Sequence, residues 1–133
     1  MNEQDFKDRT KRFGVRVIRL VVALPSGLAS QVIGRQLLRA GTSVGANYRA
    51  ACRGRSPADV ISRLSIVEEE ADESLFWMEL LIEARLMPEK KLASLMQEGN
   101  ELIAMVVASI KTLRRRAVSN PKSKIQNPKW PKP

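Results

Sequence analysis

The side chains best suited to chemistry in this sequence are carboxylates and guanidinium groups, because the chain has no histidine and a single cysteine, Cys52. Histidine is the commonest general base and a frequent metal ligand, and most nucleophile pairs depend on it. One cysteine excludes an internal disulfide and a multi-cysteine metal site, and we interpret Cys52 as a small buried apolar residue. We therefore predict a protein that is not an enzyme and that holds no metal and no cofactor.

One group of polar residues has a spacing that places it on two helix faces. Arg39, Ser43 and Asn47 follow one another at intervals of four, and Glu70 and Glu73 are three apart further along the chain. A buried carboxylate needs a hydrogen bond or an ion pair, so we expect the row of three to meet the two glutamates in a polar network that fixes helix register. The alternative is a carboxylate metal site, but di-metal bundles use Glu-x-x-His motifs, and this chain has no histidine.

Two glycines, Gly41 and Gly45, interrupt the same predicted helix. Each costs about 1 kcal/mol relative to alanine in a helix interior. Because they are four residues apart they share a face, and the missing side chains allow another backbone to come close. That backbone belongs either to a helix of the same bundle or to another subunit.

Arginines form a stripe on the first predicted helix and clusters near the ends of others. The stripe has spacings of three, four and three, and consists of Arg9, Arg12, Arg16 and Arg19. The remaining candidates are Arg35, Arg49, Arg53, Arg55, Arg114, Arg115 and Arg116. Arginine suits bidentate contact with phosphate, although a solvated helix face or a preference for helix C-termini explains such residues equally well. Aromatic residues do not interleave with these charges, so we predict salt-dependent contacts with a phosphate backbone rather than base stacking.

The charge is arranged in three blocks along a chain whose formal net charge is +9. Residues 1–55 carry 11 basic and 3 acidic side chains, residues 56–89 carry 2 and 9, and residues 90–133 carry 10 and 2. Basic surfaces of this size suggest a polyanionic partner, most commonly nucleic acid. The alternative is that the acidic block neutralises its basic neighbours inside the bundle or across subunits.

The elements that position these residues are four predicted helices, at about 5–24, 29–53, 57–87 and 88–116. Ser56 followed by Pro57 is typical of a helix start. The apolar stripe of the third helix repeats at intervals of four and three: Val60, Leu64, Val67, Ala71, Ser74, Met78 and Leu81. Such a seam is typical of bundle packing, and short loops make neighbouring helices antiparallel. We predict an all-α, up-down-up-down four-helix bundle over residues 1–116.

The C-terminal segment differs in composition from the rest of the chain. It contains "NPKSKIQ" followed by "NPKWPKP", a broken seven-residue repeat rich in proline and lysine. We predict that residues 117–133 form a disordered basic tail; base stacking by Trp130 is the functional alternative. No apolar run approaches the roughly 20 residues of a membrane span, and the charged N-terminus is unlike a signal peptide. We therefore expect a cytoplasmic protein that has no membrane association.

Two stretches, "LLRAGTSVGANYRAACRGRS" and "LSIVEEEADESLFWMELLIEARLM", resemble a family of small bacterial four-helix bundles. Its members include proteins encoded within intervening sequences of large-subunit rRNA genes and the accessory variability proteins (Avd) of diversity-generating retroelements. The resemblance covers roughly residues 5–116. Many members have Ile-Ala-Glu-Gly where this chain has Tyr48-Arg49-Ala50-Ala51, a more basic sequence that favours the Avd-like branch.

The resemblance implies a homopentameric ring with a basic surface. For the Avd-like branch it further implies binding of template RNA or cDNA, association with a retroelement reverse transcriptase, and no catalytic activity. Two other hypotheses remain open from the residues: a structural or interaction scaffold without nucleic-acid binding, and a carboxylate-metal enzyme, which would require bound metal.

Overall fold

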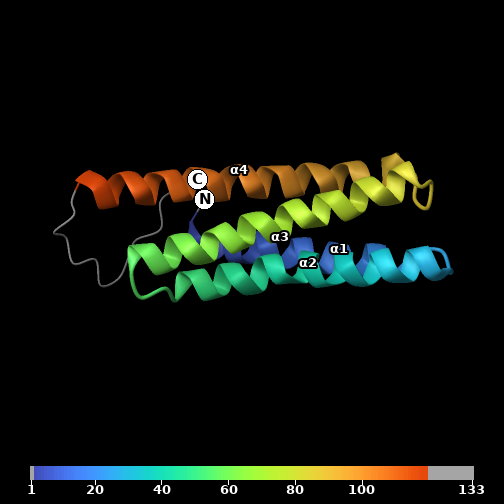
Figure 1. Ribbon diagram of the computed structural model, residues 1–133, viewed down its shortest axis with the longest axis horizontal. Helices are drawn as coiled ribbons and strands as arrows, with labels where there is room; N and C mark the ends of the chain where they lie inside the picture. Colours follow the sequence, from blue (N-terminus) through green and yellow to red (C-terminus); the bar gives the residue numbers. More distant parts are fainter. Residues whose placement is uncertain (1, 120–133) are drawn as a thin grey trace.

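Four antiparallel helices make up the computed structural model, which describes residues 2–119. They are α1 (Glu3–Val22), α2 (Leu28–Cys52), α3 (Pro57–Glu83) and α4 (Glu89–Ser119). Each helix runs back along the one before it (Figure 1), and the described residues contain no strand. The prediction of an all-α, up-down-up-down four-helix bundle is confirmed.

Local sequence explains where the helices begin. The Asn2 side chain accepts a hydrogen bond from the Asp5 N–H at 2.8 Å, and the Asn2 N–H donates to the Asp5 carboxylate, so a capping box starts α1. At the start of α3 the Ser56 side chain accepts a hydrogen bond from the Asp59 N–H at 3.1 Å, and Pro57 lies in the first turn.

The end of α3 is a Schellman motif with an unusual residue. The Leu86 N–H donates to the Leu81 carbonyl and the Arg85 N–H donates to the Ile82 carbonyl. Arg85 occupies the left-handed position with φ of 59°, where glycine is the common residue. The chain then turns into α4, which continues to Ser119, three residues past the predicted boundary. The rest of the predicted tail, residues 120–133, lies outside the described residues.

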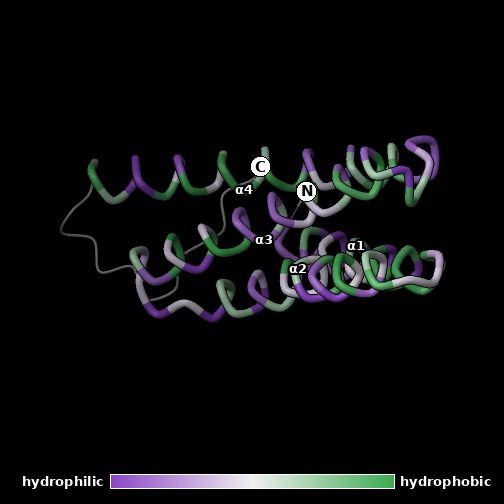
Figure 2. The backbone as a smooth tube through the Cα atoms, turned by 45° about the vertical axis from the view of Figure 1, so that its right-hand side comes forward, coloured by the Kyte–Doolittle hydropathy of each residue, from purple (hydrophilic) through white to green (hydrophobic). Residues whose placement is uncertain are grey.

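The core consists of the apolar faces of the four helices, and the predicted stripe of α3 is part of it. Every predicted stripe position of α3 is buried, as are the corresponding positions of α4: Leu92, Leu95, Leu102, Val106, Ile110 and Leu113. Along each helix, apolar and polar segments alternate at the helical repeat (Figure 2). In α1, Phe6, Thr10, Phe13 and Val17 are buried, whereas Leu20 and, just after the helix, Leu24 are half-buried. Because the apolar faces point into the core, the charged residues lie mainly on the outside of the bundle.

The three extensive helix–helix interfaces join helices that are consecutive in the chain, α1 with α2, α2 with α3, and α3 with α4. The contact between α1 and α4 is small. The longest helix, α4, projects past the other helices at its C-terminal end (Figure 1). The bundle thus has one overhanging end, where α1 begins and where α2 and α4 finish.

The glycines of α2 lie against α1 of the same chain. A Cβ atom added to Gly41 would come within 2.7 Å of both methyl groups of Val17, and one added to Gly45 would lie 3.3 Å from the Thr10 carbonyl group. Gly14 faces them from α1, since its added Cβ would lie 3.7 Å from the Gly41 carbonyl oxygen. The sequence left open whether these glycines face a helix of the same bundle or another subunit. In the structure they face α1 of the same bundle.

Candidate nucleic-acid interface

Arg39 joins α2 to α3 through the two predicted glutamates. Its Nη1 donates to Glu70 Oε2 at 3.2 Å, and its Nη2 donates to the carboxylate of Glu73. The indole N–H of Trp77 donates to the same Glu73 carboxylate at 3.2 Å. The Arg39 side chain is 48% exposed, so this cluster lies at the surface of the α2–α3 interface, where ion pairs contribute little to stability.

Ser43 and Asn47 do not take part in that cluster, contrary to the expected row of three. The Ser43 hydroxyl donates to the Arg39 carbonyl oxygen at 2.6 Å, and the Asn47 amide donates to the Ser43 carbonyl oxygen at 2.8 Å. Both bonds stay within α2. The prediction was wrong on this point because short polar side chains in a helix readily bond to the carbonyl one turn earlier. Among the side-chain hydrogen bonds and ion pairs of residues 2–119, those that join α2 to α3 come from Arg39.

Arg9, the first residue of the predicted stripe, is committed to an internal ion pair with α4. Its Nε and Nη2 donate to the two carboxylate oxygens of Glu98 at 2.9 and 2.6 Å, and Nη2 also approaches Glu101 at 3.3 Å. The Arg9 and Glu98 side chains are 20% and 18% exposed. The hydrogen bonds from Arg9 hold the pKa of Glu98 below its ordinary value. This ion pair joins α1 to α4 across their small interface. The Glu98 carboxylate would compete with a phosphate group for the Arg9 guanidinium.

The other three arginines of the stripe remain at the surface of α1. Arg12 and Arg19 are exposed, and they form no ion pair within residues 2–119. Arg16 is half-buried and donates to the hydroxyl of Ser94 at 3.0 Å, a neutral partner. Three of the four guanidinium groups therefore form no ion pair of their own within residues 2–119, although the charges of Arg12 and Arg16 act on the nearby Glu98.

The remaining predicted arginines are exposed but do not form one continuous patch. Arg35 lies near the turn between α1 and α2, beside Leu24 and Pro25. At the overhanging end the antiparallel arrangement places two groups (Figure 1). These are Arg49, Arg53 and Arg55 at the end of α2, and Arg114, Arg115 and Arg116 in the last turns of α4. Positive charge is thus concentrated at one end and along α1.

A groove between α1 and α2 adds basic residues that the sequence analysis missed. It has a volume of about 550 Å³, and Lys7, Lys11 and Arg49 are among its lining residues, with Gly45 contributing to the gap between the helices. Lys7 also forms an exposed pair with Glu3 at 3.4 Å, four residues earlier. The spacing of Lys7 and Lys11 indicated a shared helix face, but the approach of Arg49 follows only from the packing of α1 on α2.

The charge of the α1–α2 pair has a single sign over most of its length. Between Asp8 and Asp59 the sequence contains no aspartate or glutamate, whereas it contains ten lysines and arginines. This stretch covers most of α1 and all of α2. Because the two helices pack side by side, the surface they share is positive, and the acidic residues of the chain are concentrated on α3. A surface of one sign attracts a polyanion along its whole length.

Cys52 is a free cysteine and is half-buried. Burial is the main cause that raises the pKa of Cys52 to about 12, with a contribution from Glu3, so the thiol stays protonated at neutral pH. Residues 2–119 contain no group of three or more histidine, cysteine, aspartate or glutamate side chains arranged to hold a metal ion. Across the same residues, no helix combines the length and the apolar character needed to cross a membrane.

The fold and the charge distribution define a small antiparallel four-helix-bundle protein with a basic α1–α2 surface. The profile of the 23S rRNA-intervening sequence protein family matches residues 2–108, and the chain belongs to this family. A similar solved structure is a protein of unknown function from the S23 ribosomal protein family of Bacteroides thetaiotaomicron. It is 34% identical, with a TM-score of 0.74, and the alignment covers 80% of this chain and 98% of the other. A comparison with curated proteins gave no significant match.

Proposed function

We propose that this protein is a non-enzymatic accessory protein that binds RNA or cDNA through the basic surface of α1 and α2. The observation that carries the proposal is the stretch from Asp8 to Asp59 without a carboxylate, folded into two helices that lie side by side. Arginine contacts phosphate with paired N–H groups. Arg12 and Arg19 stand exposed on α1, on the same helix face from which Arg16 donates to Ser94 of α4.

The Avd-like role is the specific form of this proposal. In it, the protein assembles as a homopentamer in the cytoplasm and holds template RNA or cDNA beside a retroelement reverse transcriptase. A ring would repeat the basic surface five times, and repeated weak contacts gain strength through effective concentration. The basic sequence Tyr48-Arg49-Ala50-Ala51, which stands where many family members have Ile-Ala-Glu-Gly, supports this form.

The test is the affinity for single-stranded RNA across a salt series. If Arg12, Arg16 and Arg19 each neutralise one phosphate, the logarithm of the binding constant falls against the logarithm of salt with a slope of about −2 from this stripe alone. Charge reversal at all three positions (R12E/R16E/R19E) should remove that contribution and weaken binding at low salt by about a hundredfold or more.

A matched control reverses three other exposed charges. Arg63 lies on α3, and Lys90 and Lys91 lie in the first turn of α4, outside the α1–α2 surface. The variant R63E/K90E/K91E has the same net charge as the stripe variant and should retain most of the affinity. Equal loss in both variants would show a response to net charge alone and would refute the stripe assignment. Circular dichroism of both variants checks that the helices are intact.

A scaffold without nucleic-acid binding is the second candidate, and the internal ion pairs favour it. Arg9 and Arg39 both use their guanidinium groups to join helices of the bundle. Light scattering with and without RNA separates the candidates. A five-fold mass that binds RNA at low salt and releases it at high salt supports the accessory role, whereas a five-fold mass that ignores RNA supports the scaffold.

A further inference from the structure

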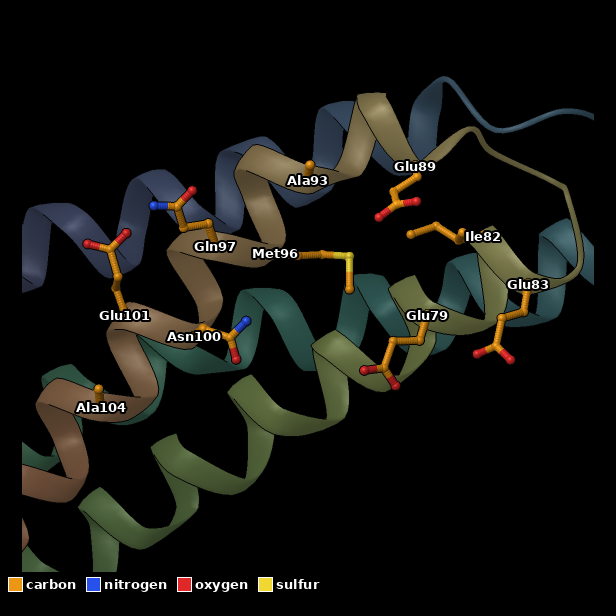
Figure 3. A pocket seen from close by; sticks show the side chains of 10 residues that line it. All are labelled: Glu79, Ile82, Glu83, Glu89, Ala93, Met96, Gln97, Asn100, Glu101 and Ala104. Atoms are coloured by element: carbon orange, nitrogen blue, oxygen red, sulfur yellow. The ribbon is translucent and has the colours of Figure 1, made fainter.

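A second groove, between the C-terminal half of α3 and the N-terminal half of α4, is lined by carboxylates. It has a volume of about 630 Å³, and Glu79, Glu83, Glu89 and Glu101 are among its lining residues. Figure 3 shows these side chains around the gap, with Met96 pointing from α4 toward α3. No lysine or arginine lines the groove among the described residues. The groove is therefore negative on a protein whose net charge is positive.

Most of these carboxylates have no cation of their own. Within residues 2–119, Glu79, Glu83 and Glu89 form no ion pair, and Glu101 shares Arg9 with Glu98. Below them, Met96 and Ile82 are half-buried and supply an apolar floor. An apolar floor with an uncompensated acidic rim suits a basic segment that carries an apolar anchor.

The chain itself contains such a segment. Residues 120–133 carry four lysines and no acidic residue, and their apolar side chains besides proline are Ile125 and Trp130. Four prolines favour an extended backbone, which lies in an open groove without needing a helix partner. The positive charge and the apolar side chains of residues 120–133 thus complement the acidic rim and the apolar floor of the groove.

The length of the segment also fits. The path back along α4 from Ser119 to Met96 is about 34 Å at 1.5 Å per residue. An extended proline-rich chain advances about 3.1 Å per residue, so Trp130, eleven residues beyond Ser119, also reaches about 34 Å. Trp130 can therefore come level with Met96, with Lys129 and Lys132 beside it among the carboxylates of the groove.

We propose that residues 120–133 dock back along α4 into the acidic groove between α3 and α4 of the same chain, with Trp130 on the floor formed by Met96 and Ile82. This contact shields the groove and places the lysines of the segment away from the α1–α2 surface. It is independent of whether the protein binds nucleic acid.

Tryptophan fluorescence of the full chain tests the proposal. The chain has two tryptophans, so W77F leaves Trp130 as the single emitter. In this background the emission of Trp130 should be blue-shifted and protected from acrylamide at low salt. E79Q/E83Q/E89Q should lower the docking constant about tenfold, the loss expected for three exposed ion pairs. High salt should reproduce that loss.

The matched control, E68Q/E69Q/D72N, makes the same charge change on α3 outside the groove and should leave Trp130 protected. Equal protection in the groove variant and the control, or exposed Trp130 in the parent at low salt, would overturn the proposal. Protection that depends on protein concentration would also overturn it, because the occupant would then be the segment of a second copy. Circular dichroism confirms that each variant is folded, so loss of the bundle cannot imitate undocking.

Discussion

Replacing Gly41 by alanine tests the close approach of α1 and α2 directly. The added Cβ would lie 2.7 Å from both methyl groups of Val17 and 2.9 Å from its Cβ, whereas carbon atoms pack best at about 3.5–4.0 Å. Rotating Val17 cannot relieve the contact with its own Cβ, and the residue is completely buried. The helices must therefore separate. Overpacking of this kind costs about 2–3 kcal/mol, and the helix propensity of alanine returns about 1 kcal/mol.

We expect G41A to lose about 1–2 kcal/mol of unfolding free energy, measured by urea denaturation followed by circular dichroism at one protein concentration. Gly14 provides the control from the facing helix. Its added Cβ would make ordinary contacts of 3.7 Å, so G14A should gain up to about 1 kcal/mol from helix propensity. G45A should fall between the two, because its Cβ would meet the Thr10 backbone at 3.3 Å.

Removing the methyl groups of Val17 should rescue the alanine. In the double variant V17A/G41A the two changes should couple favourably by at least about 1 kcal/mol in a double-mutant cycle. If G41A is as stable as G14A, or if the cycle shows no coupling, then Val17 does not lie close enough to Gly41 to exclude a side chain there.

Two further predictions concern the α1–α4 interface and the α3–α4 turn. E98Q should cost about 1–2 kcal/mol at pH 7 by breaking the bidentate pair with Arg9. Because the folded-state pKa of Glu98 is held below its ordinary value of 4.5, this advantage of the wild type should be present above pH 4.5 and disappear as the pH falls further; a pH series of denaturation curves measures it, and a constant difference would contradict the pairing. R85G should gain about 1 kcal/mol in thermal or urea unfolding by relieving the left-handed conformation, whereas A84G, at a right-handed position, should lose stability.

The helices and their buried faces could be predicted because both depend on local spacing. The seam of α3 from Val60 to Leu81 was read directly from intervals of three and four, and all of its positions are buried. The cap at Ser56 likewise depends on residues only three positions away. Such features need no knowledge of which helix lies opposite.

The contacts between helices could be predicted only in part. Arg39 meets Glu70 and Glu73, but the pairing of Arg9 with Glu98 joins residues 89 positions apart and depends on how α4 slides along α1. No sequence spacing encodes that offset. Gly14 escaped notice because a single glycine has no repeat, and its role appears only when α1 faces Gly41. The nucleic-acid assignment of the arginines stays a prediction.

The order of the helix contacts bears on how the chain folds. The three large interfaces each join a helix to the next one in the sequence, so most contacts close short loops, and proteins with such local contacts fold within microseconds to milliseconds. Each helix can dock on the one completed just before it while synthesis continues at about 5–20 residues per second. The α1–α4 interface must wait longer, because Glu98, the carboxylate that pairs with Arg9, belongs to α4, the last of the four described helices to be made.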